Sequence, residues 1–266
     1  MTAALRIFSY LPNPRIFKAT VAARLTSVEL EIRGAAGTEL PAWLWDFDAK
    51  PLDASGRAQY AHAIRASRTG FTTPLFKTDA FLAAHPFGTV PAAFSPDGAV
   101  GISESNSIMR AVARLGRRRR DLYGADAYLE SRVDGFLDAT LLFGRDVQVY
   151  ILGLRAGQVS AESHRAMSSA FHAFFTALQS ALTGTKAYLA GPELTLADIS
   201  FMGEMGLLFT EARHLALLEQ HGLEAIAGRS AREVFPEVFA HVDSLVGHEA
   251  FAPDFGPYLR ALEPAA

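Results

Sequence analysis

The stretch "SYLPNPRIFK", residues 9–18, joins a strand to a helix and sets the opening of the fold. Apolar Ile7 and Phe8 lie just before it, and the run after it has helical periodicity. Asn is a favoured N-cap and Pro is favoured in the first helical turn, so we expect a helix to begin at Asn13. A helix N-terminus that faces a cleft binds anions, whereas one inside the fold needs a capping group.

The composition is that of a globular protein with a substantial core, because half of the 266 residues are apolar and a fifth are charged. No apolar run approaches the roughly 18 to 20 residues of a membrane span, and residues 1–6 lack the layout of a signal peptide. We therefore expect a cytoplasmic protein without a membrane partner. The net charge of −3 gives no general attraction to nucleic acid.

The residue types restrict the chemistry. Cysteine is absent, which excludes disulfides, thiolate metal sites and a thiol nucleophile of the protein's own. Any thiol chemistry would therefore use the thiol of a ligand. The eight His residues never show the spacing of a zinc site, so we expect no metal. The basic run Arg117–Arg120 follows Gly116, a helix C-cap candidate, and is interpreted as a solvated helix end.

The pattern changes near residue 120, from short strands alternating with helices to helices alone. This change predicts an α/β domain over residues 1–116 and an all-helical domain over residues 117–266, with a linker at 116–126. The expected strands are Leu5–Tyr10, Val28–Arg33, Ala92–Phe94 and Val100–Ile102, and the expected later helices are Tyr128–Leu152, Ser163–Leu182 and Leu196–Leu208.

Residues 41–76 do not fit a compact opening domain, since connections in α/β units usually have about two to six residues. This insertion carries several aromatic residues, and two interpretations stay open. The rings could cover a ligand cleft or dock a partner subunit, or they could pin a surface excursion to the domain's own core. The aromatic residues are Trp43, Trp45, Phe47, Tyr60 and Phe71.

The stretch "HPFGTVPAAF", residues 85–94, enters a strand at Val90–Pro91. Pro cannot donate a ladder hydrogen bond, so at a strand's beginning it marks an exposed edge or a cis turn. The backbone of Val90 would then be available to pair with a group outside the sheet.

The stretch "ISESNSIMRAVARLG", residues 102–116, passes from strand to helix at Glu104 and Ser105. We expect Ser105 to cap the helix, whose N–H groups would face a carboxylate, while Glu104 could pair with an ammonium. An amino-acid head group would satisfy both, and a plain helix cap is the alternative. In "LAGPELTLADISF", residues 189–201, Thr195 and Asp198 have the spacing of a capping box, which we interpret as structural.

Together, in this order, these segments resemble the glutathione transferase superfamily over nearly all of the chain outside the insertion. Within the superfamily, residues 9–23 and Phe235–Phe251 look most like the transferase-like domain of the gamma subunit of translation elongation factor 1. The segments that carry the resemblance are the βαβ opening, His85–Ala93, Glu104–Ile108 and Leu189–Ile199.

The resemblance implies a thioredoxin-like N-terminal domain that holds glutathione. It also implies a helical C-terminal domain that completes a hydrophobic substrate site, and a homodimer or a heterodimer with a related chain. Pro91 would be cis and Val90 would pair with the cysteinyl backbone of glutathione. Glu104 and Ser105 would hold the γ-glutamyl head group. Lys77 would bind the glycyl carboxylate, although Phe76 stands where the family often has a His partner.

The thiol of glutathione has a pKa near 8.5, so a transferase must stabilise the thiolate. By the resemblance, Asn13 occupies the place of the family's thiolate-stabilising residue, and its amide could donate to the sulfur. Ser9 and Tyr10 are rivals for that role, and a simple N-cap is the alternative for Asn13.

Three functions follow from the resemblance. The first is a transferase that acts on a hydrophobic aromatic electrophile, with cleavage of aryl ethers from lignin as one possibility. The second is a non-catalytic binding module of the elongation-factor kind, and the third is a glutathione-dependent reductase or peroxidase. No motif locates the hydrophobic site, and Phe136, Phe143 and Tyr150, seven residues apart, fit a core stripe better than a substrate pocket.

Overall fold

The computed structural model describes residues 3–67, 70–116, 122–184 and 187–263. The chain divides into two compact units, Met1–Arg117 and Arg118–Ala266, called unit 1 and unit 2 below. The basic run Arg117–Arg120 and the middle of the expected linker lie outside the described residues.

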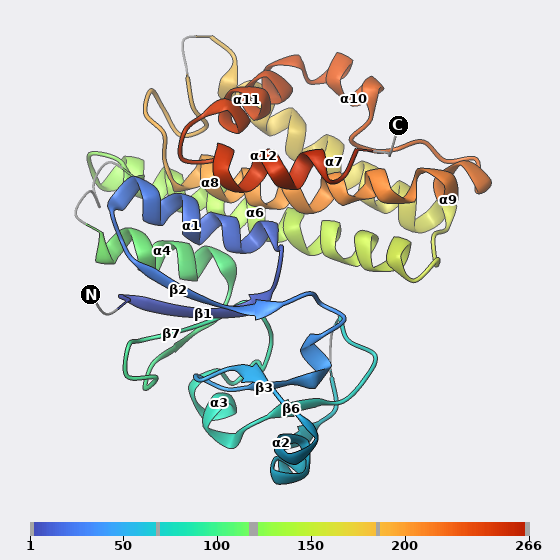
Figure 1. Ribbon diagram of the computed structural model, residues 1–266. Coiled ribbons are helices and arrows are strands. Elements are labelled where there is room, and N and C mark those ends of the chain that lie inside the picture. The colour runs from blue at the N-terminus through green and yellow to red at the C-terminus, as the bar shows by residue number, and fades with distance from the viewer. Residues whose placement is uncertain (1–2, 68–69, 117–121, 185–186, 264–266) are drawn as a thin grey trace. The chain divides into compact units, whose positions relative to one another are not determined.

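The first sheet of unit 1 has the strand order β2-β1-β7-β8. Its strands are β1 (Leu5–Tyr10), β2 (Leu30–Ala35), β7 (Ala92–Phe94) and β8 (Gly101–Ile102). The pair β1–β2 is parallel and is connected by α1 (Pro14–Thr26), whereas β1–β7 and β7–β8 are antiparallel. α4 (Ser105–Leu115) follows β8, and Figure 1 shows α1 and α4 side by side over one face of this sheet. The expected thioredoxin-like order is confirmed.

The second strand begins two residues later than expected. Ser27 takes a left-handed conformation (φ 58°) as the C-cap of α1, and the Val28 N–H donates to the Ala23 carbonyl. Residues 27 and 28 therefore still close the helix, which delays the start of β2 to Leu30.

The insertion builds a second sheet with the order β4-β3-β6-β5. In this sheet β3 and β6 are parallel, and the other two pairs are antiparallel. The strands have only two or three residues each, which is too short to show the alternating pattern of apolar residues that predicts a strand. They are β3 (Trp43–Trp45), β4 (Lys50–Pro51), β5 (Ile64–Arg65) and β6 (Leu75–Lys77), accompanied by the short helices α2 (Ala54–Gln59) and α3 (Asp79–Ala84).

The core of unit 1 between these layers is aromatic. Trp45 is 1% exposed and makes edge-to-face contacts with Phe8 of β1 and Phe81 of α3, at centroid distances of 5.3 and 6.1 Å. Phe71 also meets Trp45 edge to face, and Trp43 stacks on Phe8. Four of the five aromatic residues named above for the insertion, Trp43, Trp45, Phe47 and Phe71, therefore pack in or against the domain's own core, as one of the two interpretations expected, whereas Tyr60 contacts the His62 ring.

Unit 2 is all helical (Figure 1). Its buried centre is α8 (Leu196–Leu208), in which every residue is buried. The expected bounds of α8 and its capping box between Thr195 and Asp198 are confirmed. Within the described residues no helix is long and apolar enough to cross a membrane. The other helices are α6 (Ala127–Arg155), α7 (Ala161–Leu182), α9 (Leu215–Gln220), α10 (Arg229–Val234), α11 (Pro236–Gly247) and α12 (Ala252–Arg260).

The seven-residue aromatic series on α6 is largely a core stripe. Phe143 and Tyr150 are 3% and 4% exposed, whereas Phe136 is half-buried beneath the Arg132 guanidinium. The Tyr150 hydroxyl donates to the Glu211 carboxylate at 2.7 Å, and burial raises the pKa of Tyr150 well above its usual range. Phe143 and Tyr150 are thus packing residues.

Candidate functional site

Asn13 begins α1 where β1 ends, and it does two things at once. Its side-chain oxygen accepts from the Arg15 N–H at 2.9 Å, so the expected N-cap is confirmed. Its amide nitrogen donates to the Ser9 hydroxyl at 3.0 Å, and both side chains are fully buried. Because Ser9 accepts this bond, its own hydroxyl proton is not used in it. Tyr10, the next residue of β1, is half-buried.

Val90–Pro91 is a cis peptide bond, as the resemblance implied. Strand β7 begins at the next residue, and its antiparallel register pairs Ala92 with Phe8 of β1. Because the two strands run in opposite directions, the start of β7 lies beside the end of β1. The end of β1, the start of α1 and the cis peptide therefore lie at the same end of the sheet.

The loop before this cis bond is held at Gly88 from two sides. The Lys77 ammonium donates to the Gly88 carbonyl at 2.6 Å, and His85 Nδ1 accepts from the Gly88 N–H at 3.1 Å. Lys77, at the end of β6, is 6% exposed and lies 4.9 Å above the Trp45 ring. A glycyl carboxylate bound there would share the ammonium with a backbone carbonyl.

His85 was not singled out as a site residue. It is 1% exposed and stacks on Phe81, and burial lowers its pKa below the usual range of histidine. Glu104 raises this pKa and Lys77 lowers it, so both charges act on the ring. Since Nδ1 accepts a hydrogen bond, the neutral ring carries its proton on Nε2, which has no partner among the described residues.

Glu104 and Ser105 lie at the start of α4, but the expected cap is wrong. Glu104 occupies the N-cap position with φ 66°, and its side chain makes no capping hydrogen bond. Ser105 is the first helical residue, so its hydroxyl cannot reach the N–H groups that an N-cap serves. Glu104 is exposed and Ser105 is buried.

Lys18, which was not among the expected site residues, is 1% exposed in the middle of α1. Its ammonium donates to the Ser105 hydroxyl at 3.2 Å and to the Asn106 side-chain oxygen at 2.9 Å. A lysine inside the apolar run "RIFKATVAA" was the available signal, because most residues of α1 are buried. Its partners, 87 and 88 residues further along, could not be read from the sequence.

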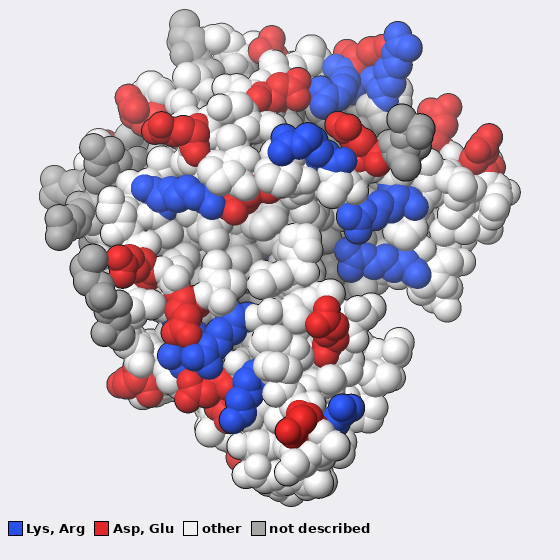
Figure 2. All heavy atoms as spheres, viewed as in Figure 1, with Lys and Arg blue, Asp and Glu red and all other residues white. Residues whose placement is uncertain are grey.

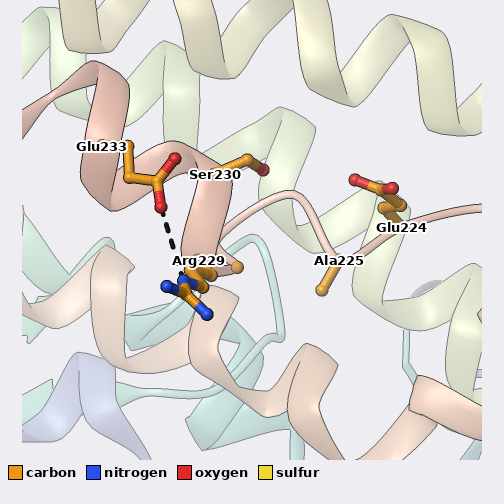
Figure 3. A pocket seen from close by; sticks show the side chains of 6 residues that line it. Glu224, Ala225, Arg229, Ser230 and Glu233 are labelled. Atoms are coloured by element: carbon orange, nitrogen blue, oxygen red, sulfur yellow. Dashed lines mark ion pairs between the residues drawn. The ribbon is translucent and has the colours of Figure 1, made fainter.

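Unit 2 carries an open pocket of about 370 Å³ at the start of α10 (Figure 3). None of the expected site residues lines it. Its one ion pair joins the exposed side chains of Arg229 and Glu233. On the face drawn in Figure 2, acidic and basic side chains are mixed among uncharged ones, so no field of one sign marks that face. The lining residues are Glu224, Ala225, Gly228, Arg229, Ser230 and Glu233.

No family model matches the chain. It is 27% identical over 253 residues to the glutathione S-transferase-like protein FUS3 of Gibberella fujikuroi, covering 92% of this chain and 94% of that protein.

Two solved structures share the fold at lower identity. A glutathione S-transferase from Drosophila melanogaster superposes with a TM-score of 0.62 at 18% identity, covering 97% of this chain and 93% of the other. A glutathione S-transferase from Methylobacillus flagellatus, solved with glutathione bound, superposes with a TM-score of 0.61 at 13% identity, covering 94% and 98%. The expected fold class, a thioredoxin-like region followed by an all-helical domain, is confirmed. None of these comparisons points specifically to the elongation-factor subunit.

Proposed function

We propose that this chain, whose fold is that of the glutathione transferase superfamily, binds glutathione in unit 1 and transfers it to a hydrophobic aromatic electrophile. The proposal is supported by one observation. The end of β1, the cis peptide Val90–Pro91 and the start of α4 all belong to one sheet and its helices. The similar Methylobacillus flagellatus protein holds glutathione in the same fold.

The contacts proposed for glutathione are few. The Val90 backbone pairs with the cysteinyl residue, Glu104 binds the ammonium, and Ser105 with the start of α4 binds the γ-glutamyl carboxylate. The Lys77 ammonium binds the glycyl carboxylate. Each charged hydrogen bond of this kind contributes about 1.5 to 3 kcal/mol.

Isothermal calorimetry with glutathione tests the binding. Glu104→Ala and Ser105→Ala should each weaken glutathione binding by at least about tenfold, which is the lower end of that energy range. Ser107→Ala, two residues further along α4 with a half-buried side chain, is the matched control and should bind as the parent does. Unchanged affinity in both site variants would remove the assignment.

For the thiolate, we propose a donor at the junction of β1 and α1. Asn13 has a second amide proton, and the bond between the two residues does not use the Ser9 hydroxyl proton, so either group can donate to the sulfur. Asn13→Ala, Ser9→Ala and Tyr10→Phe, titrated by thiolate absorbance in the glutathione complex, separate the candidates. The variant that raises the thiol pKa and lowers turnover about ten- to hundredfold identifies the donor. Asn13→Ala acting like the parent would leave Asn13 as a cap alone.

Aryl ethers derived from lignin are the substrate subclass that we propose to assay first. Release of the phenol from a model aryl ether, with formation of the glutathione thioether, is the diagnostic product pair. If the protein turns over simple aromatic halides but not aryl ethers, the proposed transferase activity stands and the aryl-ether subclass is wrong. Peroxide or disulfide reduction with oxidation of two glutathiones would indicate the reductase instead.

A non-catalytic binding domain of the elongation-factor kind is the second candidate. It is favoured by the bond between Asn13 and Ser9, which engages two of the three thiolate candidates with each other. Glutathione binding without any lowering of the thiol pKa would support this candidate over the enzyme.

We further propose that the chain pairs with itself or with a related chain. α6 exposes apolar side chains: Tyr128 is 89% exposed, Leu142 68% and Val149 66%. Leu142 and Val149 are seven residues apart and so share a helix face. Light scattering at micromolar concentration should give a two-subunit mass, and Leu142→Glu should reduce it. A monomeric mass for the parent, alone and with a co-encoded relative, would contradict pairing.

A further inference from the structure

Lys18 is the most deeply buried charged side chain next to the start of α4. It is 1% exposed, and its ammonium donates to Ser105 Oγ at 3.2 Å and to Asn106 Oδ1 at 2.9 Å. Ser105 and Asn106 are themselves 7% and 4% exposed. The group therefore joins α1 to the first turn of α4 inside unit 1.

The chemistry of these groups fixes the role of the Ser105 hydroxyl. An ammonium only donates, so Ser105 Oγ is the acceptor in its bond with Lys18. The Ser105 proton must then go to a different acceptor, and the part of the chain that the structure describes provides none. A buried hydroxyl held in this way at a helix start is poised to donate to an anion, where the backbone N–H groups and the ammonium also favour negative charge.

We propose that Lys18 is a positioning residue for the γ-glutamyl carboxylate of glutathione. Because Lys18 donates to Ser105 Oγ, the Ser105 hydroxyl proton is available for the carboxylate. Lys18 also places a positive charge next to the first turn of α4, without itself contacting the carboxylate. This inference rests on the proposed function. The alternative is that Lys18 only links two helices, in which case its loss would affect stability but not the recognition of one particular ligand group.

Two ligands separate these roles. Glutathione carries the α-carboxylate of its γ-glutamyl residue, and the analogue 4-aminobutanoyl-cysteinylglycine lacks only that carboxylate. Lys18→Met keeps the length of the stem and removes the charge and the donors. We expect Lys18→Met to weaken glutathione binding at least tenfold in calorimetry and to leave the affinity for the analogue unchanged. Lys18→Arg, which keeps charge and donors, should recover part of the loss.

Asn106→Asp gives a second route that keeps an oxygen acceptor for the Lys18 ammonium. The new carboxylate adds a negative charge in the first turn of α4. We expect a several-fold loss of affinity for glutathione and none for the analogue. An equal loss for both ligands, or no loss for glutathione in either variant, would overturn the inference. If the parent protein binds no glutathione at all, the proposed function fails as well, so the two failures are distinguishable.

Discussion

The starts of α8 in unit 2 and α4 in unit 1 differ in how the polar groups of the first helical turn are hydrogen-bonded. Thr195 caps α8, and the buried Asp198 carboxylate accepts from the Leu189 N–H, the Thr195 N–H and hydroxyl, and His241 Nε2 at 2.9 to 3.1 Å. The N-cap of α4 is Glu104, whose exposed side chain caps nothing.

The difference lies in where the polar groups find their partners. At α8 every oxygen of the carboxylate is used inside the protein, so the helix start contributes to stability and has nothing left for a ligand. At α4 a buried lysine from α1 donates to Ser105 and Asn106, while the Glu104 side chain caps none of the first N–H groups. The glutathione site that we propose at α4 uses an unsaturated first turn of this kind, whereas the saturated first turn of α8 serves stability.

Removing the carboxylate at α8 should give the largest effect. Asp198→Ala leaves four donors without their acceptor, three of them local and one on His241, and should lower the free energy of unfolding by about 3 to 5 kcal/mol. Urea unfolding followed by circular dichroism measures the loss. Asp243→Ala, in an exposed ion pair with Arg232, is the control and should stay within about 0.5 kcal/mol. If Asp198→Ala lowers the free energy of unfolding no more than the control does, the start of α8 is not the stabilising site that distinguishes it from α4.

At the start of α4, replacement of Glu104 by Gly should increase stability and weaken glutathione binding. Glu104 has φ 66°, so Glu104→Gly should relieve strain and raise the free energy of unfolding by about 1 kcal/mol. It should also weaken glutathione binding at least about tenfold, because the charged partner of the ammonium is lost. Glu104→Ala should weaken binding equally without the gain in stability. A variant Glu104→Gly that is destabilised would show that the side chain serves the fold.

His85 gives a pH test of the loop next to α4. Well above pH 6.5 its ring is uncharged in both the folded and the unfolded state, so it contributes no pH dependence there. Below about pH 6.5 the unfolded chain takes up a proton, while burial keeps the pKa of the folded ring lower, so stability falls as the solution is acidified. The slope from this residue is at most about 1.4 kcal/mol per pH unit.

His85→Gln should remove that part of the acid sensitivity between pH 7 and pH 5, measured by urea unfolding at each pH. His62→Gln, at an exposed position, is the control. Equal acid sensitivity in the parent and in His85→Gln would assign the effect to other groups.

The smallest effect is expected at the start of α1, which stands between the two extremes. Asn13→Asp keeps an oxygen for the Arg15 N–H and should change the free energy of unfolding by less than about 0.5 kcal/mol. Asn13→Ala removes the cap and should cost about 1 kcal/mol. Thermal unfolding of the two variants measures the difference. Neither variant has the amide that donates to Ser9. Equal losses of unfolding free energy would therefore indicate that this bond, and not the cap, stabilises the start of α1.

The same contrast explains what the sequence could predict. The capping box of α8 lies within four consecutive residues, so the box and the start of the helix were readable. At α4 the contact with Lys18 spans 87 residues of sequence, and the positive φ of Glu104 has no sequence signal, so the cap was assigned to the wrong residue. The second sheet of unit 1 escaped prediction because strands of two or three residues show no period, although their aromatic residues were noticed.

Both tryptophans of the chain lie in that second sheet, and this gives the protein an optical reporter of one unit. Trp45 is enclosed, with its indole N–H donating to the Leu40 carbonyl at 3.2 Å, while Trp43 stacks on Phe8. Selective excitation of indole therefore follows unit 1 alone, even though most of the helices belong to unit 2. The Lys77 ammonium lies over the Trp45 ring. A carboxylate that forms an ion pair with Lys77 should therefore change the fluorescence emission of Trp45 in the intact protein, without any added label.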